Sequence, residues 1–279
     1  MICYDCPRMC GVDREKSKGF CREGNKIRVS KIIENFMWEE PCISGTKGAL
    51  AIFFSGCNLR CEFCQNIEIS HKGKGDCYSP EQFRELLKKY DLTKYSSIDL
   101  ITPTHFSSLL YEALCDFKSP VPIVWNSSGY ESEQMIEKVS EFVDVFLPDF
   151  KYFSSELSAK LSLAEDYYEV ALKAIKKMRE KKPNNVFNDD ILTSGLLIRH
   201  LVLPGQAKDS MKILQTIKQQ IKEPLCSIMS QFTPVGKTFS RKIYPLEYKI
   251  VLDYAEKIGL NDGYFQDYES ANKNFIPDF

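Results

Sequence analysis

The sequence predicts an α/β fold built from repeated strand–helix units, on two observations. From Ala49 onward, short apolar runs alternate with segments whose apolar residues recur at helical spacing. Each apolar run ends in polar or turn-forming residues, and in parallel folds the carboxyl ends of the strands form the ligand-facing rim. Six such units are too few for an eight-stranded barrel, so the pattern leaves a partial barrel and an open doubly wound sheet as alternatives.

The expected strands are short runs rich in apolar and β-branched residues. They are Leu50–Phe54, Ser97–Ile101, Val121–Trp125, Val143–Leu147, Leu196–Val202 and Ser227–Gln231. The expected helices cover roughly 79–90, 106–117, 132–142, 167–181, 210–221 and 245–258. The first helix has the clearest start, because Ser79 can cap it, Pro80 suits its first turn and Gln82 completes a capping box.

Composition argues against two kinds of partner. The 37 Lys and Arg residues nearly balance the 38 Asp and Glu residues, so no overall field favours nucleic acid or an anionic membrane. The chain has neither a run of about 18 apolar residues nor a basic start followed by an apolar core, so we expect a cytoplasmic protein. In such a chain, 11 cysteines indicate metal or thiolate chemistry rather than disulfides.

Three cysteines, Cys57, Cys61 and Cys64, follow the first expected strand directly. Three thiolates this close in sequence can wrap a soft metal cluster without closing a long loop. They also leave one corner of a four-iron cluster open to a substrate or cofactor. A zinc site completed by His71 and a chance grouping of cysteines are the alternatives. The residues that flank the cysteines favour an open [4Fe–4S] cluster.

The motif C-x3-C-x-aromatic-C after a first strand resembles the defining motif of the radical S-adenosylmethionine (SAM) superfamily. The wider segment from Phe54 to Asn66 resembles the pyruvate formate-lyase activating enzyme and its relatives. Four other stretches resemble an activating-enzyme-like branch of that group, so the resemblance covers nearly the whole chain. They are Glu39–Thr46, Thr102–Phe106, Leu147–Tyr152 and Arg199–Gly205.

This resemblance implies a fold, two cofactors and an electron donor. The fold would be a partial (β/α)6 TIM-like barrel. The cofactors would be a [4Fe–4S] cluster and SAM, which is cleaved to a 5′-deoxyadenosyl radical that abstracts hydrogen from a substrate. Reduced flavodoxin or ferredoxin would supply the electron, and a protein substrate is one option.

The resemblance also assigns SAM contacts to individual residues. Phe63 matches the aromatic residue that contacts the adenine, with ordinary loop packing as the alternative. Asn126 and Ser128 stand where the activating enzymes carry Asp-Thr-Asn-Gly, and both can still hydrogen-bond a ribose or a carboxylate. Asp149 and Lys151 match an Asp-x-Lys that closes the fourth strand, where they would bind a ligand or ion or else form a salt bridge.

Arg199 resembles a fifth-strand arginine that can bind the SAM carboxylate; the alternative is an inward structural ion pair. After the second strand the activating enzymes commonly carry Gly-Gly-Glu, whereas this chain has Thr102-Pro103-Thr104-His105. The charge that would bind the SAM amino group is therefore missing. We expect His105 and Gln231 to face the substrate, with His105 as a catalytic acid or base, although a capping or packed histidine is the alternative.

Four more cysteines, Cys3, Cys6, Cys10 and Cys21, crowd the N-terminus among Pro7, Gly11, Gly19 and Gly24. Four thiolates make a closed site, which we expect to hold zinc or an auxiliary iron–sulfur cluster, because so short a segment cannot build a core of its own. Free thiols in an extended tail are the alternative. The chain is thus expected to divide into a cysteine-rich extension, 1–45, and a radical SAM partial barrel, 46–279.

Three functions follow from this reading. The first is an activase that installs a glycyl radical on a protein, and the second is a radical SAM enzyme that modifies a small molecule or another macromolecule. The third is a non-catalytic iron–sulfur electron carrier or zinc-binding module. An electron carrier needs neither the open iron nor the polar rim, which favours the first two. The polar loop Asn184–Asp190 is expected near the rim.

Overall fold

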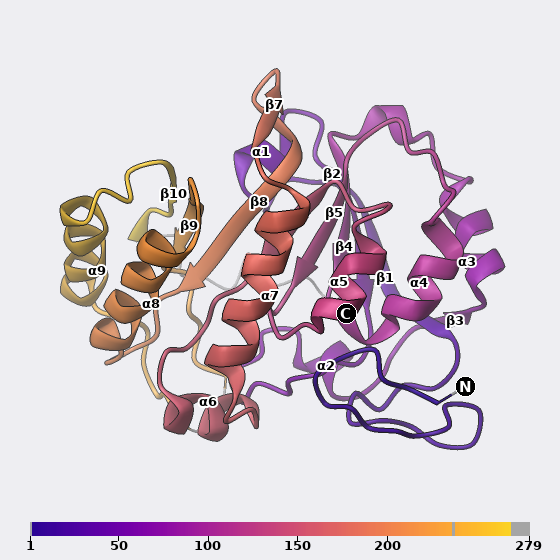
Figure 1. The fold of residues 1–279 in the computed structure, drawn as a ribbon, viewed down its shortest axis with the longest axis horizontal. Helices are drawn as coiled ribbons and strands as arrows, with labels where there is room; N and C mark the ends of the chain where they lie inside the picture. The colour runs from indigo at the N-terminus through magenta and orange to yellow at the C-terminus, as the bar shows by residue number, and fades with distance from the viewer. Residues whose placement is uncertain (1, 236–237, 269–279) are drawn as a thin grey trace.

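A ten-stranded sheet forms the centre of the computed structural model, which describes residues 2–235 and 238–268 (Figure 1). Its strands are β1 (Ile27–Phe36), β2 (Ala49–Phe54), β3 (Asp76–Tyr78), β4 (Ser97–Ile101), β5 (Ile123–Ser127), β6 (Val145–Pro148), β7 (Val186–Asn188), β8 (Ile191–Leu201), β9 (Leu225–Met229) and β10 (Gly263–Phe265). The helices are α1 (Pro41–Ser44), α2 (Ile67–Ser70), α3 (Pro80–Leu87), α4 (Ser107–Leu114), α5 (Glu133–Val139), α6 (Ser155–Ser162), α7 (Tyr167–Lys181), α8 (Ala207–Gln220) and α9 (Pro245–Lys257).

The sheet is parallel except at one side and at β7, which pairs with β8 in the antiparallel sense. Its strand order is β10-β9-β8-β6-β5-β4-β2-β1-β3, with β7 paired to β8. The strands from β2 to β10 in this order run parallel to one another, whereas β1 is antiparallel to both β2 and β3. The predicted α/β class is confirmed. All six expected strands are present; Ser97–Ile101 has the predicted bounds and the other five have shifted ends.

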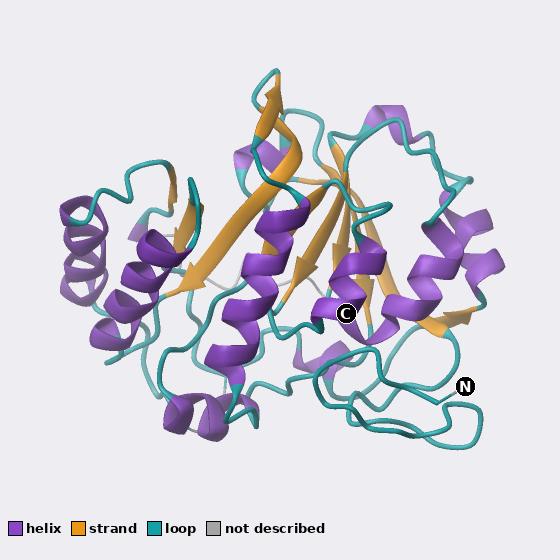
Figure 2. Ribbon diagram, viewed as in Figure 1, coloured by secondary structure: helices purple, strands orange, loops and turns teal. Residues whose placement is uncertain are grey.

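The helices distinguish a partial barrel from a doubly wound sheet, since the latter carries helices on both faces. Figure 2 shows α4, α5, α7 and α8 in front of the parallel strands. In β2, Leu50, Ile52 and Phe54 belong to the main core on the helix side, whereas Ala49, Ala51 and Phe53 belong to a separate buried group. This alternation leaves the second face of the sheet free to line a cavity, as in a partial barrel.

Local signals at the helix ends were read correctly. Ser79 Oγ accepts a hydrogen bond from Gln82 N at 3.2 Å, and the Gln82 side chain accepts one from Ser79 N at 2.9 Å, so the predicted capping box is confirmed. α7 spans Tyr167–Lys181, the predicted range. The sequence reading missed α1 and α2, which have only four residues each and are too short to display a helical period, and it also missed α6.

Two expectations about segments need correction. The loop Asn184–Asp190 lies far from the rim, because β7 pairs with the first residues of β8 and the resulting hairpin extends beyond the amino ends of the strands (Figure 1). The strand expected at 196–202 begins earlier, at Ile191, because that hairpin lengthens it. β1, β3 and β10 were also missed; two of these strands are only three residues long.

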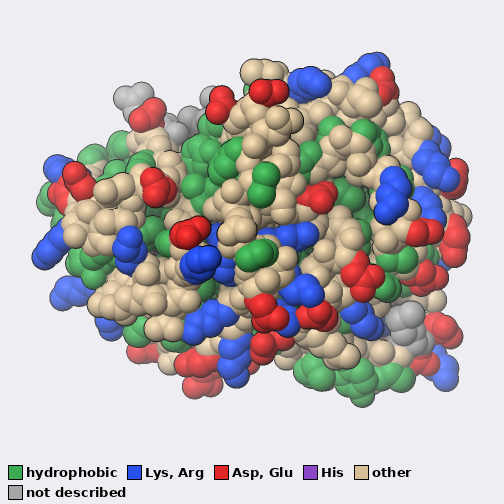
Figure 3. All heavy atoms as spheres, turned by 45° about the horizontal axis from the view of Figure 1, so that its top comes forward, with side chains coloured by type: hydrophobic (Ala, Val, Ile, Leu, Met, Phe, Trp, Pro, Cys, Tyr) green, Lys and Arg blue, Asp and Glu red, His purple; other side chains and the backbone are tan. Residues whose placement is uncertain are grey.

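The surface agrees with the balanced composition. On the face shown in Figure 3, Lys and Arg side chains are interspersed with Asp and Glu. Among the described residues, no helix has both the length and the apolar character needed to span a membrane.

Candidate functional site

A cavity of about 530 Å³ lies between the three-cysteine loop and the inner face of the sheet. Most of the predicted site residues contribute to its lining. They are Cys57, Cys61, Phe63, Cys64, Asn126, Ser128, Asp149, Lys151, Arg199 and Gln231. The strands thus bring together side chains that lie up to about 170 positions apart in the sequence, and the volume falls in the usual range for a small-molecule site.

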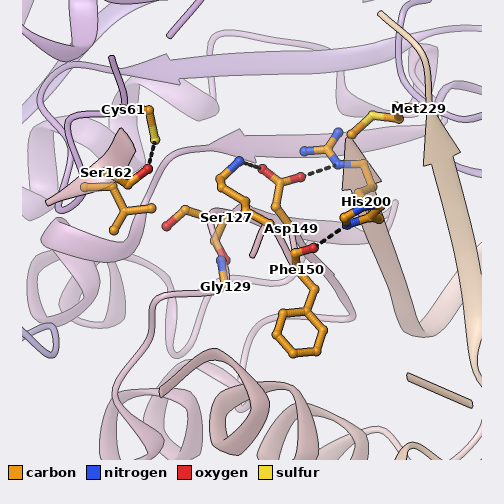
Figure 4. A network of polar contacts seen from close by, with 12 residues as sticks. Cys61, Ser127, Gly129, Asp149, Phe150, Ser162, His200 and Met229 are labelled. Carbon is orange, nitrogen blue, oxygen red and sulfur yellow. Dashed lines mark hydrogen bonds and ion pairs between the residues drawn. The ribbon is translucent and has the colours of Figure 1, made fainter. Parts of the chain in front are cut away.

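The cysteine loop is held in shape by backbone conformation and by contacts to its sulfur atoms. Gly56 has a φ of 80°, and a Cβ there would lie 2.7 Å from the carbonyl oxygen of Cys21, so only glycine fits. Leu59 N donates to Cys57 Sγ at 3.4 Å, and Ser162 Oγ donates to Cys61 Sγ at 3.0 Å (Figure 4).

Cys64 has a comparable environment. Its Sγ shares a hydrogen bond with Ser70 Oγ at 3.3 Å, and Ser70 in turn contacts His71 Nδ1 at 2.8 Å. His71, which the zinc alternative required as a fourth ligand, therefore reaches the cysteines through a serine.

The donor set of this loop suits a cluster better than a single ion. Nowhere in residues 2–235 and 238–268 do three His, Cys, Asp or Glu side chains converge as ligands of one metal ion. A four-iron cluster takes one thiolate at each iron, so its cysteines stand farther apart than the ligands of one ion. Three soft thiol donors beside a cavity that is itself lined with polar groups fit a cluster with one open iron.

Arg199 lies at the centre of a buried ionic network behind the cysteines. Its Nη1 pairs with Glu39 at 2.7 Å, its Nε pairs with Asp149 at 3.2 Å, and its Nη2 donates to Asn126 Oδ1. Lys151 pairs with the other oxygen of Asp149, so that Asp149 lies between two cations (Figure 4). Each nitrogen of the guanidinium group has a protein partner, which supports the inward ion pair over a free SAM ligand.

The electrostatics of the network follow from burial and pairing. Burial alone would raise the pKa of Asp149, but Lys151 and Arg199 hold it below its ordinary value. Burial raises the pKa of Glu39 despite the nearby Arg199. Burial and the neighbouring Glu39 raise the pKa of Asp99 well above its ordinary value.

Of three further predicted residues, Ser128 and Phe63 occupy positions suited to a ligand, whereas Asn126 does not. Asn126 Nδ2 donates to Asp99 at 3.1 Å and to Glu39 at 3.3 Å, so this amide belongs to the ionic network. Ser128 lines the cavity, and its buried Oγ has no hydrogen-bond partner among the described residues, as expected of a group reserved for a ligand. Phe63 lies at the cavity wall with its ring centroid 5.8 Å from that of Phe232.

His105 does not fit the substrate-side role that the sequence suggested. It is fully buried and lies outside the cavity lining; its Nε2 contacts the carbonyl oxygen of Ser55 at 2.7 Å. Burial lowers its pKa to about 3, so the ring is neutral at physiological pH. The packed-histidine alternative describes its position: His105 ties the end of β4 to the start of the cysteine loop.

The N-terminal cysteines gather in a small loop structure. Cys3, Cys6 and Cys21 are buried, and a Cβ on Gly19 would lie 3.4 Å from Cys10 Sγ and 3.7 Å from Cys21 Sγ. The prediction of zinc or an auxiliary cluster at these four residues stays a prediction.

This loop structure packs directly against the three-cysteine loop and its surroundings. Arg8 Nε donates to the carbonyl oxygen of Asn58 at 2.8 Å, and Arg14 donates to that of His105 at 2.6 Å. Together with the contact between Cys21 and Gly56, these bonds join the two groups of cysteines.

Several acidic residues of the site escaped the sequence reading. Glu39 and Glu40 line the cavity from the segment before α1, and Asp99 lies behind Glu39 on β4. One signal was available, since a carboxylate within the apolar run Ser97–Ile101 is expensive to bury unless it is paired or protonated.

Comparisons with known proteins were made for the whole chain. A family model described as the radical SAM superfamily matches residues 51–217, more than half of the chain. The uncharacterized protein MJ0674 of Methanocaldococcus jannaschii is 29% identical over 274 residues, which cover 93% of this chain and 75% of that protein.

Solved structures share the fold at low sequence identity. Methylornithine synthase superposes with a TM-score of 0.50 at 15% identity, covering 74% of this chain and 61% of its own. SuiB of Streptococcus suis, bound to its precursor peptide SuiA, gives 0.51 at 14%, covering 76% and 46%. A spore photoproduct lyase variant gives 0.51 at 10%, covering 77% and 74%. The chain thus spans about three fifths of the first structure and under half of the second.

Proposed function

Because this chain belongs to the radical SAM superfamily, we propose that Cys57, Cys61 and Cys64 hold a [4Fe–4S] cluster whose open iron faces the cavity. When bound, the reduced cluster and SAM supply the chemistry: one electron splits SAM into methionine and a 5′-deoxyadenosyl radical, which takes a hydrogen atom from the substrate. The observation that carries this proposal is the meeting of three thiols and a polar cavity at the carboxyl ends of the strands.

The chain's own residues would hold the thiolates in place. Ser162 and Leu59 N donate hydrogen bonds to two of the sulfurs, and Ser70 contacts the third. Hydrogen bonds to cluster sulfurs stabilise the more negative, reduced state, so these contacts tune the potential at which an electron enters. A reducing partner such as flavodoxin or ferredoxin would supply that electron.

SAM would lie between the cysteine loop and the ionic network. Ser128 offers an unpartnered hydroxyl and Phe63 an aromatic face for the adenine. We assign the methionine carboxylate to Lys151, whose ammonium group lies within electrostatic range of Cys61, rather than to the fully paired Arg199. Asp149 and Asn126 would then position Lys151 and Arg199 without contacting the methionine group themselves.

The substrate remains of two candidate kinds: a glycyl loop of a partner protein, or a small molecule. A cavity of about 530 Å³ that must also admit SAM leaves room for one small molecule or one short peptide segment. Both kinds fit hydrogen abstraction, whereas an electron carrier would need no such cavity.

The test is anaerobic reconstitution with iron and sulfide, followed by chromatographic detection of 5′-deoxyadenosine after reduction by dithionite. The wild type should bind four irons at this loop and cleave SAM, and Cys61→Ala should abolish cleavage. Cys115→Ala serves as the matched control, since Cys115 is exposed and lies away from the cavity lining. Wild-type rates of cleavage by Cys61→Ala would overturn the proposal.

A further inference from the structure

The charged side chains that line the cavity include more carboxylates than cations. They are Glu39, Glu40, Asp149, Lys151 and Arg199. Glu39 pairs with Arg199, and Asp149 pairs with Lys151. Once these two pairs are formed, Glu40 is the lining carboxylate left without a cation among the described residues.

Glu40 is itself well buried. Only 9% of the residue is exposed, and its Oε2 is shielded from water without a hydrogen-bond partner in the described part of the chain. Burial of a carboxylate oxygen without a partner is unfavourable, and a cationic ligand would remove that cost. The position therefore suits a group that is completed when a ligand enters the cavity.

Glu40 and the cysteine loop lie at opposite ends of the strands. Glu40 immediately precedes α1, which lies near the amino ends of the strands, whereas the cysteine loop follows the carboxyl end of β2 (Figure 1). Ser97 Oγ, at the first residue of β4, donates to the carbonyl oxygen of Ile43 at 2.9 Å and holds α1 there. Glu40 would thus lie across the cavity from a cofactor bound at the cysteines.

Two aromatic side chains line the same cavity, Trp38 and Tyr264. Burial raises the pKa of the Tyr264 phenol most, followed by its hydrogen bond with Cys42, and the nearby charge of Glu40 adds to the shift. The rings of Phe36 and Trp38 lie 5.3 Å apart and form a wall. A carboxylate next to aromatic faces is a combination that binds organic cations, through charge on one side and ring quadrupoles on the other.

We propose that the substrate carries an ammonium or guanidinium group, which Glu40 binds at the side of the cavity away from the cysteines. That the bound cation is a substrate rests on the proposed function; that a cation binds at Glu40 does not. An amine, a guanidine or a basic peptide side chain would all present the required group. The cation would give the Glu40 carboxylate the partner that it lacks among the described residues.

The test measures binding of two probes of nearly equal shape, benzylammonium and benzyl alcohol, to the reconstituted protein with SAM by anaerobic calorimetry. The wild type should bind the cation at least tenfold more tightly, in line with a charge-assisted contact. Glu40→Gln should remove this preference, and Glu40→Asp should restore part of it. Glu112→Gln, an exposed carboxylate on α4, is the matched control and should keep the full preference.

Equal affinity of the wild type for the two probes would overturn the proposal, as would a preference that survives in Glu40→Gln. Loss of SAM affinity in Glu40→Gln would also overturn it, because Glu40 would then serve the cofactor. Failure of the proposed function looks different: the protein would keep its preference for the cation but would not cleave SAM.

Discussion

Replacing Arg199 by methionine tests whether this residue organises the site or binds SAM. The guanidinium group meets Glu39, Asp149 and Asn126, and its side chain is only 13% exposed. Methionine has a similar volume but no charge, so the variant leaves two buried carboxylates short of a cation. Removing one partner of a buried ion pair costs about 3–5 kcal/mol, and we expect that loss in the free energy of unfolding. For a chain of this size it corresponds to a fall in Tm of roughly 10 °C.

The dependence on pH gives the prediction a second signature. In the wild type the pKa of Asp149 is lowered, so its contribution to stability is present above the unfolded value of about 4 and is lost as the pH falls through the folded value. Without Arg199 the pKa of Asp149 rises, and this contribution shrinks. The difference in stability between wild type and Arg199→Met should therefore be full at pH 7.5 and down to about pH 4, and should narrow below pH 4.

Urea unfolding of the metal-free protein, followed by circular dichroism at pH 7.5 and at about pH 3, measures both effects. Lys249→Met is the control; its ion pair with Asp253 is more than half exposed, so a change below about 1 kcal/mol is expected. The double variant Glu39→Gln with Arg199→Met should recover part of the loss, because one unpaired carboxylate is gone. If Arg199→Met unfolds within about 1 kcal/mol of the wild type but no longer binds SAM, Arg199 is a SAM ligand and the reasoning is wrong.

Three further outcomes are expected. Burial raises the pKa of Glu131 from 4.5 to about 7, so this group should cost the wild type about 3 kcal/mol of stability as the pH rises from 4.5 to 7. In urea titrations, Glu131→Gln should reduce this dependence of the unfolding free energy on pH. His105→Ala should destabilise the protein by roughly 2–4 kcal/mol yet bind SAM within about twofold of the wild type; a large loss of SAM affinity would return His105 to the site. Elemental analysis of a variant in which Cys57, Cys61 and Cys64 are replaced by alanine should find zinc or iron, and the added substitution Cys6→Ser should remove that metal. A metal-free triple variant would exclude a metal site at the N-terminal cysteines.

The sequence determined the elements that depend on local pattern. Ala49–Phe54 forms a strand because six consecutive apolar residues can be buried on both faces of a parallel sheet, and Ser79 begins a helix because its hydroxyl satisfies a free backbone amide. The group of Cys57, Cys61 and Cys64 was also readable, because all three donors lie in one short loop. Such features depend on neighbours a few residues apart.

The tertiary structure decided which distant side chains meet. Glu39 and Arg199 are 160 positions apart and pair only because the segment before α1 packs against β8. The guanidinium group that the sequence suggested for SAM is therefore already bonded to a protein carboxylate. Glu40 of the same segment stays without an ion pair, and His105, in the turn after β4, lies behind the cysteine loop rather than in the cavity. The charge of a buried group depends on every neighbour that displaces water from it, and those neighbours come from strands whose order is fixed only when the whole sheet assembles.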